Sequence, residues 1–125
     1  MGQRTLLIVD DEPKIRAMLA DCLGQEGLSI DTAGSGEEAL AKIAQATPDV
    51  VILDVKMKGM SGLDVLKQVR TSQPRLAALI VTGFDDERLE EEASRLGVLG
   101  VIRKPLMLAE VRQALRQVLA QLPFV

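Results

Sequence analysis

The sequence contains no histidine, no tryptophan and no tyrosine, and Phe84 and Phe124 are its only aromatic residues. Without histidine, the chain cannot supply a histidine base, nucleophile or metal ligand. Because aromatic rings are so scarce, a surface on which nucleic-acid bases stack is not expected. The core must be filled by aliphatic residues and methionine, which make up almost all of the hydrophobic 47% of the chain.

Cysteine and long apolar segments are equally scarce. Cys22 is the single cysteine, so the chain has neither an internal disulfide nor a second thiol for a zinc site, and a reducing compartment fits best. The apolar run near the N-terminus is short and leads directly into Asp10, Asp11 and Glu12, unlike a signal peptide or a membrane span. We therefore expect a cytoplasmic protein without a membrane-embedded part.

Chain length and net charge limit the number of domains and the classes of function that remain. A chain of 125 residues can build one core, so we expect residues 1–125 to form a single domain. Lysine and arginine number 15 against 18 aspartate and glutamate residues, which gives a net charge of −3. This balance does not support a basic surface, so direct binding of nucleic acid by this domain is not expected.

Short aliphatic segments alternate five times with longer segments of helical periodicity. Four of the short segments are nearly continuous aliphatic runs, as in parallel strands buried on both faces. Residues 28–33 instead alternate apolar and polar, as in a strand nearer the edge. The alternation predicts an α/β fold, a doubly wound parallel sheet with helices on both faces. The predicted strands are residues 5–9, 28–33, 50–53, 77–81 and 100–102.

The helical segments carry start signals and apolar faces. Pro13 suits a first helical turn, because its missing N–H has no partner there. The pairs Ser35 with Glu38 and Ser61 with Asp64 are typical of capping boxes. The last helix has the clearest apolar face, formed by Leu108, Val111, Leu115, Val118 and Leu122.

Polar residues follow the predicted strands, at the edge where ligands bind in open α/β sheets. Asp10 and Asp11 follow the first strand, and Asp54 follows the third. Thr82 follows the fourth strand, and Lys104 lies just after the fifth. Three carboxylates in one crevice repel one another, so we expect a hard divalent cation to neutralise them, for which Mg²⁺ is the best candidate.

These groups together suit phosphoryl transfer. A carboxylate can attack phosphorus, and a threonine hydroxyl and a lysine ammonium can bind the oxygens of the transferred group. In such reactions, positioning and neutralisation of charge carry most of the catalysis. We therefore interpret the crevice as a phosphoryl-transfer site.

Four motifs, in this order, resemble those of the receiver domains of two-component response regulators. They are VDDEP at 9–13, LDVKMKGMSGLD at 53–64, VTG at 81–83 and RKP at 103–105, each at a predicted strand end. The resemblance covers nearly the whole chain. It implies a flavodoxin-like (βα)5 fold with a five-stranded parallel sheet in the order 2-1-3-4-5. It also implies a regulatory phosphoacceptor rather than an enzyme, one that assists its own phosphorylation and dephosphorylation.

The resemblance further implies a phosphoacceptor and a set of metal ligands. Asp54 would accept the phosphoryl group and lie beside the Mg²⁺ ion. Asp11 would bind Mg²⁺ directly and Asp10 would bind it through water, while the backbone carbonyl of Lys56 would complete the protein ligands.

By the same resemblance, Thr82 and Lys104 would contact the phosphoryl oxygens, and a cis peptide would precede Pro105. The phosphoryl group would come from the phosphohistidine of a sensor histidine kinase or a phosphotransfer protein. It would shift the domain toward a state that binds a downstream protein, with Thr82 as the moving contact.

The sequence departs from the family pattern at three positions. Lys58 stands where the family usually has proline, and Ser61 stands where it often has aspartate, which alters the stiffness of the loop rather than its ligands. Val101 stands where the family usually has an aromatic switch residue. Because valine cannot swing a ring toward Thr82, the coupling has to run through Thr82 and aliphatic packing.

Two residues are expected to influence the lifetime of the phosphoryl group. Lys56 and Phe84 stand two residues after Asp54 and Thr82, respectively, and would flank the phosphoryl group. Phe84 is expected to slow hydrolysis by covering the site.

Two other functions remain as alternatives. The first is a receiver-fold interaction module that binds its partner without phosphorylation, which Val101 and the unusual loop favour. The second is a phosphohydrolase with an aspartyl nucleophile, but such enzymes usually have a second acid where this chain has Lys56.

The output of the domain is left open. The fourth helix begins with many acidic residues, which form either a solvated face or a partner surface, and we expect Arg112 and Arg116 of the fifth helix near them. A homodimer through the fourth and fifth helices is one arrangement. Since the chain stops at Val125 without an effector domain, we expect either a stand-alone receiver or a piece of a longer regulator.

Overall fold

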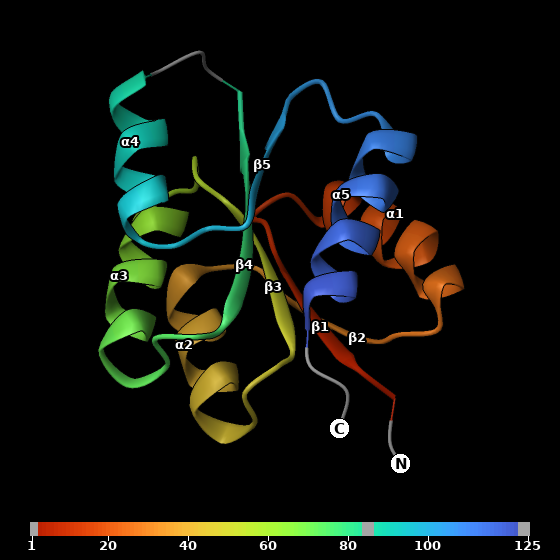
Figure 1. Cartoon of the computed structure of the whole chain (residues 1–125), viewed down its shortest axis with the longest axis horizontal. Coiled ribbons are helices and arrows are strands. Elements are labelled where there is room, and N and C mark those ends of the chain that lie inside the picture. The colour runs from red at the N-terminus through yellow and green to blue at the C-terminus, as the bar shows by residue number, and fades with distance from the viewer. Residues whose placement is uncertain (1–2, 84–86, 123–125) are drawn as a thin grey trace.

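The computed structural model describes residues 3–83 and 87–122, which form a parallel sheet between two layers of helices (Figure 1). The strand order across the sheet is β2-β1-β3-β4-β5, and every neighbouring pair is parallel, which confirms the predicted fold and order. The strands are β1 (Thr5–Val9), β2 (Ser29–Ala33), β3 (Val50–Asp54), β4 (Ala77–Thr82) and β5 (Gly100–Arg103).

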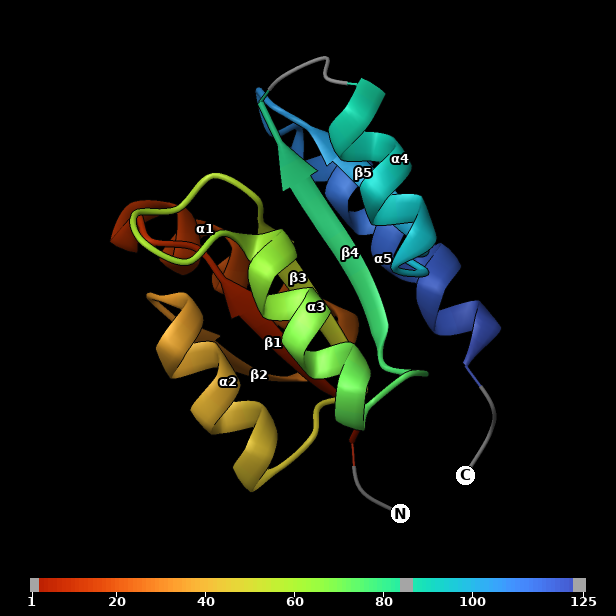
Figure 2. The ribbon, with the colours of Figure 1, turned by 90° about the vertical axis from the view of Figure 1, so that its left-hand side faces the viewer.

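The helices connect consecutive strands. They are α1 (Pro13–Leu23), α2 (Gly36–Gln45), α3 (Gly62–Ser72), α4 (Glu87–Arg95) and α5 (Leu108–Gln121), with a short 3-10 helix, η1 (Gly24–Glu26), after α1. As predicted, Pro13 occupies the first turn of α1. Helices α1 and α5 cover one face of the sheet, whereas α2, α3 and α4 cover the other (Figures 1 and 2).

Each face of the sheet has its own aliphatic core. Successive residues of β1 alternate between the two cores, so Leu7 packs toward α2 and α3 while Leu6 packs toward α1 and α5. All residues of β3 and β4 are buried, whereas β2 alternates exposed and partly buried residues up to Ala33, as expected for an edge strand. Within the described ranges, none of the helices is both long enough and apolar enough to cross a bilayer.

The two predicted capping boxes differ in detail. At α3, the Ser61 hydroxyl accepts from the Asp64 N–H, and the Asp64 carboxylate accepts from the Ser61 N–H, so this box is complete. At α2, the Ser35 hydroxyl accepts from the Glu38 N–H, but the Glu38 carboxylate accepts from the N–H of Gly34 (2.6 Å). The Glu38 carboxylate thus satisfies the N–H of the residue before the N-cap, and this box is incomplete.

Arg70 joins the C-terminal ends of α3 and α4. Its guanidinium donates to the carbonyl oxygens of Leu96 (2.7 Å) and Leu76 (2.7 Å), and also to those of Gln73 (3.0 Å) and Gly97 (3.4 Å). Carbonyls at helix ends have no partner within the helix, so one side chain satisfies groups from both helices. This contact anchors the end of α4 that is remote from the predicted site.

The expectation that basic residues of α5 lie near the acids of α4 is wrong. Arg116 pairs with Glu26 of η1 (2.6 Å), and the charge of Arg112 also acts on this carboxylate. The reason is topological, because α5 packs against α1 on one face of the sheet while α4 lies on the other (Figure 1). Arg103 and Lys67 pair with acidic residues of α4 instead.

Candidate functional site

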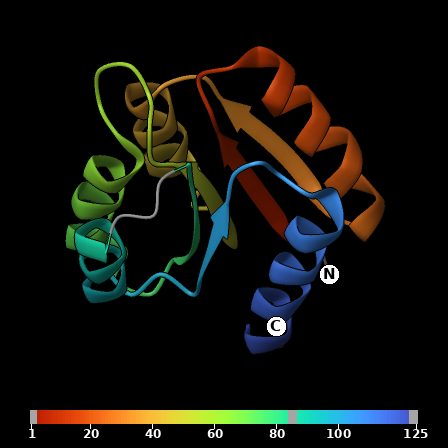
Figure 3. The same cartoon turned by 90° about the horizontal axis from the view of Figure 1, so that it is seen from above.

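The predicted site residues meet at the edge formed by the C-terminal ends of the strands, which Figure 3 views from above. Strand β1 leads into Asp10 and Asp11, and β3 ends in Asp54. Strand β4 ends in Thr82, and β5 leads into Lys104. Since β1, β3, β4 and β5 are consecutive neighbours in the sheet, the strand order places all these residues along one edge.

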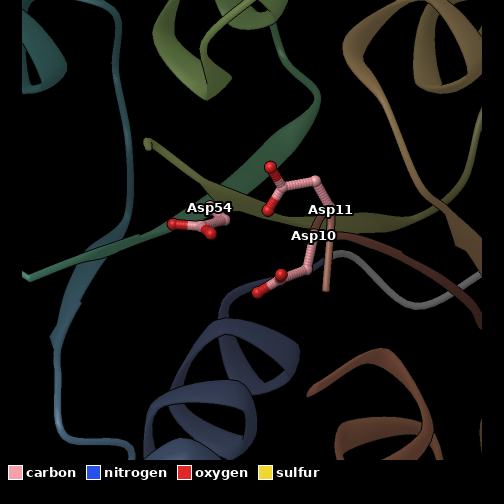
Figure 4. A group of neighbouring side chains, drawn as sticks. All are labelled: Asp10, Asp11 and Asp54. Atoms are coloured by element: carbon pink, nitrogen blue, oxygen red, sulfur yellow. The ribbon is translucent and has the colours of Figure 1, made fainter. Parts of the chain in front are cut away.

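Three carboxylates form a cluster at this edge. Oxygens of Asp10, Asp11 and Asp54 lie within 4.8 Å of one another, and the side chains approach a shared space (Figure 4). Asp10 and Asp54 are 3% and 2% exposed, whereas Asp11 is partly exposed. The cluster therefore has two members removed from water and one at the surface.

Each carboxylate accepts a hydrogen bond from a backbone N–H. Asp10 Oδ1 accepts from the N–H two residues later, that of Glu12 (2.9 Å). Asp54 Oδ1 likewise accepts from the N–H two residues later, at position 56 (3.2 Å). Asp11 Oδ2 accepts from the N–H of Lys58 (3.1 Å), which is 47 residues away in the loop between β3 and α3. The main chain thus orients all three side chains.

Burial and crowding make the ionised cluster unfavourable. Burial raises the pKa of Asp10 from 3.8 to about 6; the negative charges of Asp54 and Asp11 add to the rise, and the Glu12 N–H and Lys104 oppose it. Burial also raises the pKa of Asp54, against the opposing effect of the Lys104 ammonium. A cation held among the three carboxylates would stabilise their ionised forms, and so would oppose both the effect of burial and the repulsion between the negative charges.

Lys104 brings positive charge to the cluster. Its ammonium Nζ lies 3.4 Å from Asp54 Oδ2, and its backbone N–H donates to the carbonyl of Thr82 (2.8 Å). The peptide bond between Lys104 and Pro105 is cis, as the family resemblance implies. The Thr82 residue is 2% exposed, so its position at the end of β4 is enclosed by protein.

The start of α3 packs tightly against the backbone of Asp54. A Cβ atom at Gly62 would lie 2.4 Å from the Asp54 carbonyl oxygen, so no side chain fits there. The Gly62 N–H donates to the carbonyl of Val55 (3.1 Å), which fixes the same approach. Glycine at this position therefore allows α3 to begin directly against the strand end that carries the candidate phosphoacceptor.

Arg16 lies next to the site, and its position there is not predicted by the sequence. Its guanidinium donates to the backbone carbonyl of Asp10 (2.7 Å), and Nη1 would lie 2.9 Å from a Cβ atom at Gly34. Arg16 therefore holds the turn after β1 against the loop after β2. No motif in the sequence indicates this contact, because it joins a helical side chain to main-chain atoms.

The remaining predicted residues lie outside the carboxylate cluster or outside the described ranges. Val101 lies on β5, is partly buried and packs against the core under α2, α3 and α4. Pro105 is exposed, as is the Lys56 side chain. Phe84, expected to cover the site, is not among the described residues.

The donor set fits a hard divalent cation. Carboxylate oxygens are the ligands that Mg²⁺ prefers, and they converge here from two neighbouring strands. Two of the carboxyl groups have a raised pKa, which is the expected cost of gathering buried negative charge without a compensating cation. The residues present thus suit the ion that the sequence predicts.

The chain matches the family model described as "Response regulator receiver domain" over residues 6–116. It is 41% identical over 117 residues to the probable transcriptional regulatory protein TcrX of Mycobacterium tuberculosis, covering 92% of this chain and 49% of that protein. It is 32% identical over 119 residues to the sporulation initiation phosphotransferase F of Bacillus subtilis, covering 95% and 96%, respectively. The chain thus spans about half of one relative and nearly all of the other.

Solved structures agree with this similarity. The chemotaxis protein CheY4 of Vibrio cholerae superposes with a TM-score of 0.88 at 32% sequence identity, and the match covers 94% of this chain and 99% of that one. The sheet order, the acidic cluster and the family match over residues 6–116 lead to the same result. This chain belongs to the response regulator receiver domain family.

Proposed function

We propose that this receiver domain accepts a phosphoryl group on Asp54 and that the modification switches its contacts with other proteins. The observation that carries this proposal is the position of the Asp54 carboxylate. It is 2% exposed, within 4.8 Å of the other two carboxylates, and 3.4 Å from the Lys104 ammonium. The Asp54 carboxylate, the proposed nucleophile, thus lies close both to the carboxylates that would hold a cation and to the Lys104 ammonium.

The transfer is a substitution at phosphorus. One oxygen of the ionised Asp54 carboxylate forms a bond to phosphorus as the bond between phosphorus and the donor's histidine nitrogen breaks. The nitrogen leaves with the bonding electron pair, and the histidine takes up a proton from solvent. Burial raises the pKa of Asp54 and so disfavours its ionised form. The nearby Lys104 ammonium opposes this rise and favours the ionised carboxylate that the step requires.

Mg²⁺ would be held by Asp11 and Asp54, by Asp10 through water, and by the backbone carbonyl of Lys56. When bound, it would neutralise charge on the transferred group. Thr82 and Lys104 would bind the phosphoryl oxygens, and movement of Thr82 would shift the domain between two pre-existing states. The backbone bonds from Glu12, Lys56 and Lys58 support this assignment, because they orient the three carboxylates in advance.

The partners follow from this role. The donor would be a sensor histidine kinase or a phosphotransfer protein, and the output would be a downstream protein or an effector domain. We assign the domain to the cytoplasm, with residues 1–125 as a single unit that binds neither membrane nor nucleic acid directly. Dimerisation through α4 and α5 is one form that the output could take. Conversion of a separate substrate is not part of the proposed function.

A second candidate function is a receiver-fold module that binds its partner without phosphorylation. The observation that favours it is Val101, an aliphatic residue packed into the core where an aromatic switch residue is usual in the family. Partner binding that persists after Asp54→Ala and does not depend on Mg²⁺ would support this module.

Incubation with acetyl phosphate and Mg²⁺ tests the proposed function. We expect intact-mass spectrometry to detect one added phosphoryl group, which Asp54→Ala abolishes and which chelation of Mg²⁺ reduces at least about tenfold. Asp21→Asn, which changes an exposed acid of α1, is the matched control and should still be modified. An adduct that survives Asp54→Ala, or no adduct and no conformational change with beryllofluoride, would contradict the proposal.

A further inference from the structure

The loop between β3 and α3 supplies a hydrogen-bond donor to the metal site through its main chain. The N–H of Lys58 donates to Oδ2 of Asp11 at 3.1 Å, across 47 residues of sequence. A backbone N–H that bonds to one carboxylate oxygen leaves the other oxygen of the same group for a cation. We propose that the Lys58 N–H is a positioning group for Mg²⁺, an inference that rests on the proposed function of this site.

Asp11 depends on this bond more than its two neighbours depend on theirs. Asp10 and Asp54 are almost fully buried, and each accepts from an N–H only two residues further along the chain. Asp11 is partly exposed, and its bond reaches to a separate loop. An exposed carboxylate without such a bond samples several rotamers, so ordering it on metal binding would cost free energy. The Lys58 N–H reduces that cost in advance.

The loop is fixed on both sides of Lys58. Before it, the side chain of Met57 is 9% exposed and belongs to the core under α2 and α3. After it, Gly59 has a left-handed φ of 75°, and Met60 packs closely against Gly36. These contacts hold the loop close to the turn after β1, where the Lys58 N–H reaches Asp11.

The proposed role belongs to the peptide group and not to the side chain. The lysine side chain at position 58 is exposed, and any residue with a backbone N–H can donate in the same way. Proline is the exception, because its ring replaces the N–H. The replacement of the usual family proline by Lys58 thus adds a donor at this position, beyond any effect on the stiffness of the loop.

The test compares Lys58→Pro with Lys58→Ala, since both remove the lysine charge and only the first removes the N–H. Titration of Mg²⁺ followed by NMR should show that Lys58→Pro binds about fivefold more weakly than Lys58→Ala. Circular dichroism and urea unfolding establish that both variants are folded. Equal affinities, or tighter binding by Lys58→Pro, would overturn the proposal. If the parent protein itself bound no Mg²⁺, the proposed function would fail instead.

Hydrogen exchange in Mg²⁺-free protein tests the same bond without proline or metal. Asp11→Ala should speed exchange of the Lys58 amide about tenfold, because the amide loses its acceptor. The Lys56 amide is the internal control, since its acceptor is Asp54 and its exchange should be unchanged. If the Lys58 amide exchanged equally fast with and without the Asp11 carboxylate, the positioning role would be disproved even if Lys58→Pro failed to fold.

Discussion

The two halves of the site differ in how their groups are held. In the acidic half, formed by Asp10, Asp11 and Asp54, every carboxylate accepts a backbone N–H bond. In the switch half, formed by Thr82, Val101 and Lys104, the Lys104 ammonium lies 3.4 Å from Asp54 on a side chain that is 31% exposed. The main chain therefore fixes the groups expected to bind the cation, while side chains on β4 and after β5 are the ones proposed to meet the transferred group.

This difference suggests that the two halves have different roles. Groups that must be in place before a ligand arrives gain from rigid support, because less order is then lost on binding. Groups that report the ligand must be able to move between two arrangements. Substitutions in the acidic half should therefore change stability and metal affinity, and substitutions in the switch half should change the response with little effect on stability.

The largest expected effect comes from the close approach of α3 to the acidic half. Gly62→Ala would place a Cβ atom 2.4 Å from the Asp54 carbonyl oxygen, and both contacting segments are backbone. We expect the free energy of unfolding to fall by at least about 3 kcal/mol, as measured by urea unfolding. The main chain that carries Asp54 has to shift, so labelling by acetyl phosphate should fall as well.

Gly59→Ala is the matched control for this substitution. Gly59 has a φ of 75° but nothing lies within 4 Å of a Cβ atom there, so the cost is the left-handed conformation alone, about 1 kcal/mol. If Gly59→Ala destabilised the protein as much as Gly62→Ala, the close approach to Asp54 would not be the cause.

A smaller effect, with a distinctive pH dependence, is expected from Asp10→Asn. Because the folded pKa of Asp10 is raised from 3.8 to about 6, its contribution to stability is full below pH 3.8 and is lost as the pH rises through about 6. In Mg²⁺-free buffer at pH 7, the free energy of unfolding should therefore rise by about 2 kcal/mol in Asp10→Asn. Urea unfolding at several pH values measures this gain.

The gain should shrink toward pH 4, where Asp10 of the folded parent protein is already protonated. Asp21→Asn, at an exposed position of α1, should change stability by less than about 0.5 kcal/mol at either pH. An Asp10→Asn gain that is the same at both pH values would mean that repulsion and burial of charge do not destabilise the acidic half.

The smallest effect on stability is expected in the switch half. Thr82→Val replaces the hydroxyl by a methyl group of similar size at a buried position, while the backbone carbonyl that accepts from Lys104 remains. We expect the loss of the hydroxyl to lower the free energy of unfolding by no more than about 1 kcal/mol, the net contribution of one hydrogen bond, and to change Mg²⁺ affinity by less than about twofold. The NMR shift changes that beryllofluoride causes at Val101 should nevertheless be lost.

Thr82→Ser is the comparison, because it keeps the hydroxyl and should keep the response at Val101. If Thr82→Val responded to beryllofluoride like the parent protein, the route from Asp54 to β5 would not run through the Thr82 hydroxyl. The Thr82 hydroxyl would then not belong to the groups that respond to the ligand.

The sequence predicted the fold and the site edge well because both depend on periodic signals. Aliphatic runs located the strands to within one residue at either end, and the residue that follows each run defines the edge of a parallel sheet. The sequence alone therefore places Asp10, Asp11, Asp54, Thr82 and Lys104 along one edge of the sheet, where the structure also has them.

Contacts between main chain and distant side chains could not be predicted. The bonds from Lys58 to Asp11, and from Arg16 to the Asp10 carbonyl, involve backbone atoms that nearly every residue type possesses, so no residue type marks them in the sequence. The prediction that Arg112 and Arg116 lie near the acids of α4 is wrong for a similar reason. Which helices exchange charge pairs depends on the face of the sheet that each helix covers. Charge composition carries no information about that choice.

The backbone donors of the acidic half also bear on how the domain can evolve. Since the three N–H groups belong to the peptide chain, the side chains of Glu12, Lys56 and Lys58 can vary without loss of the bonds, as long as none becomes proline. All three residues are exposed around the mouth of the site. Selection can therefore change the charge that a partner protein meets there while the arrangement of the carboxylates is inherited unchanged.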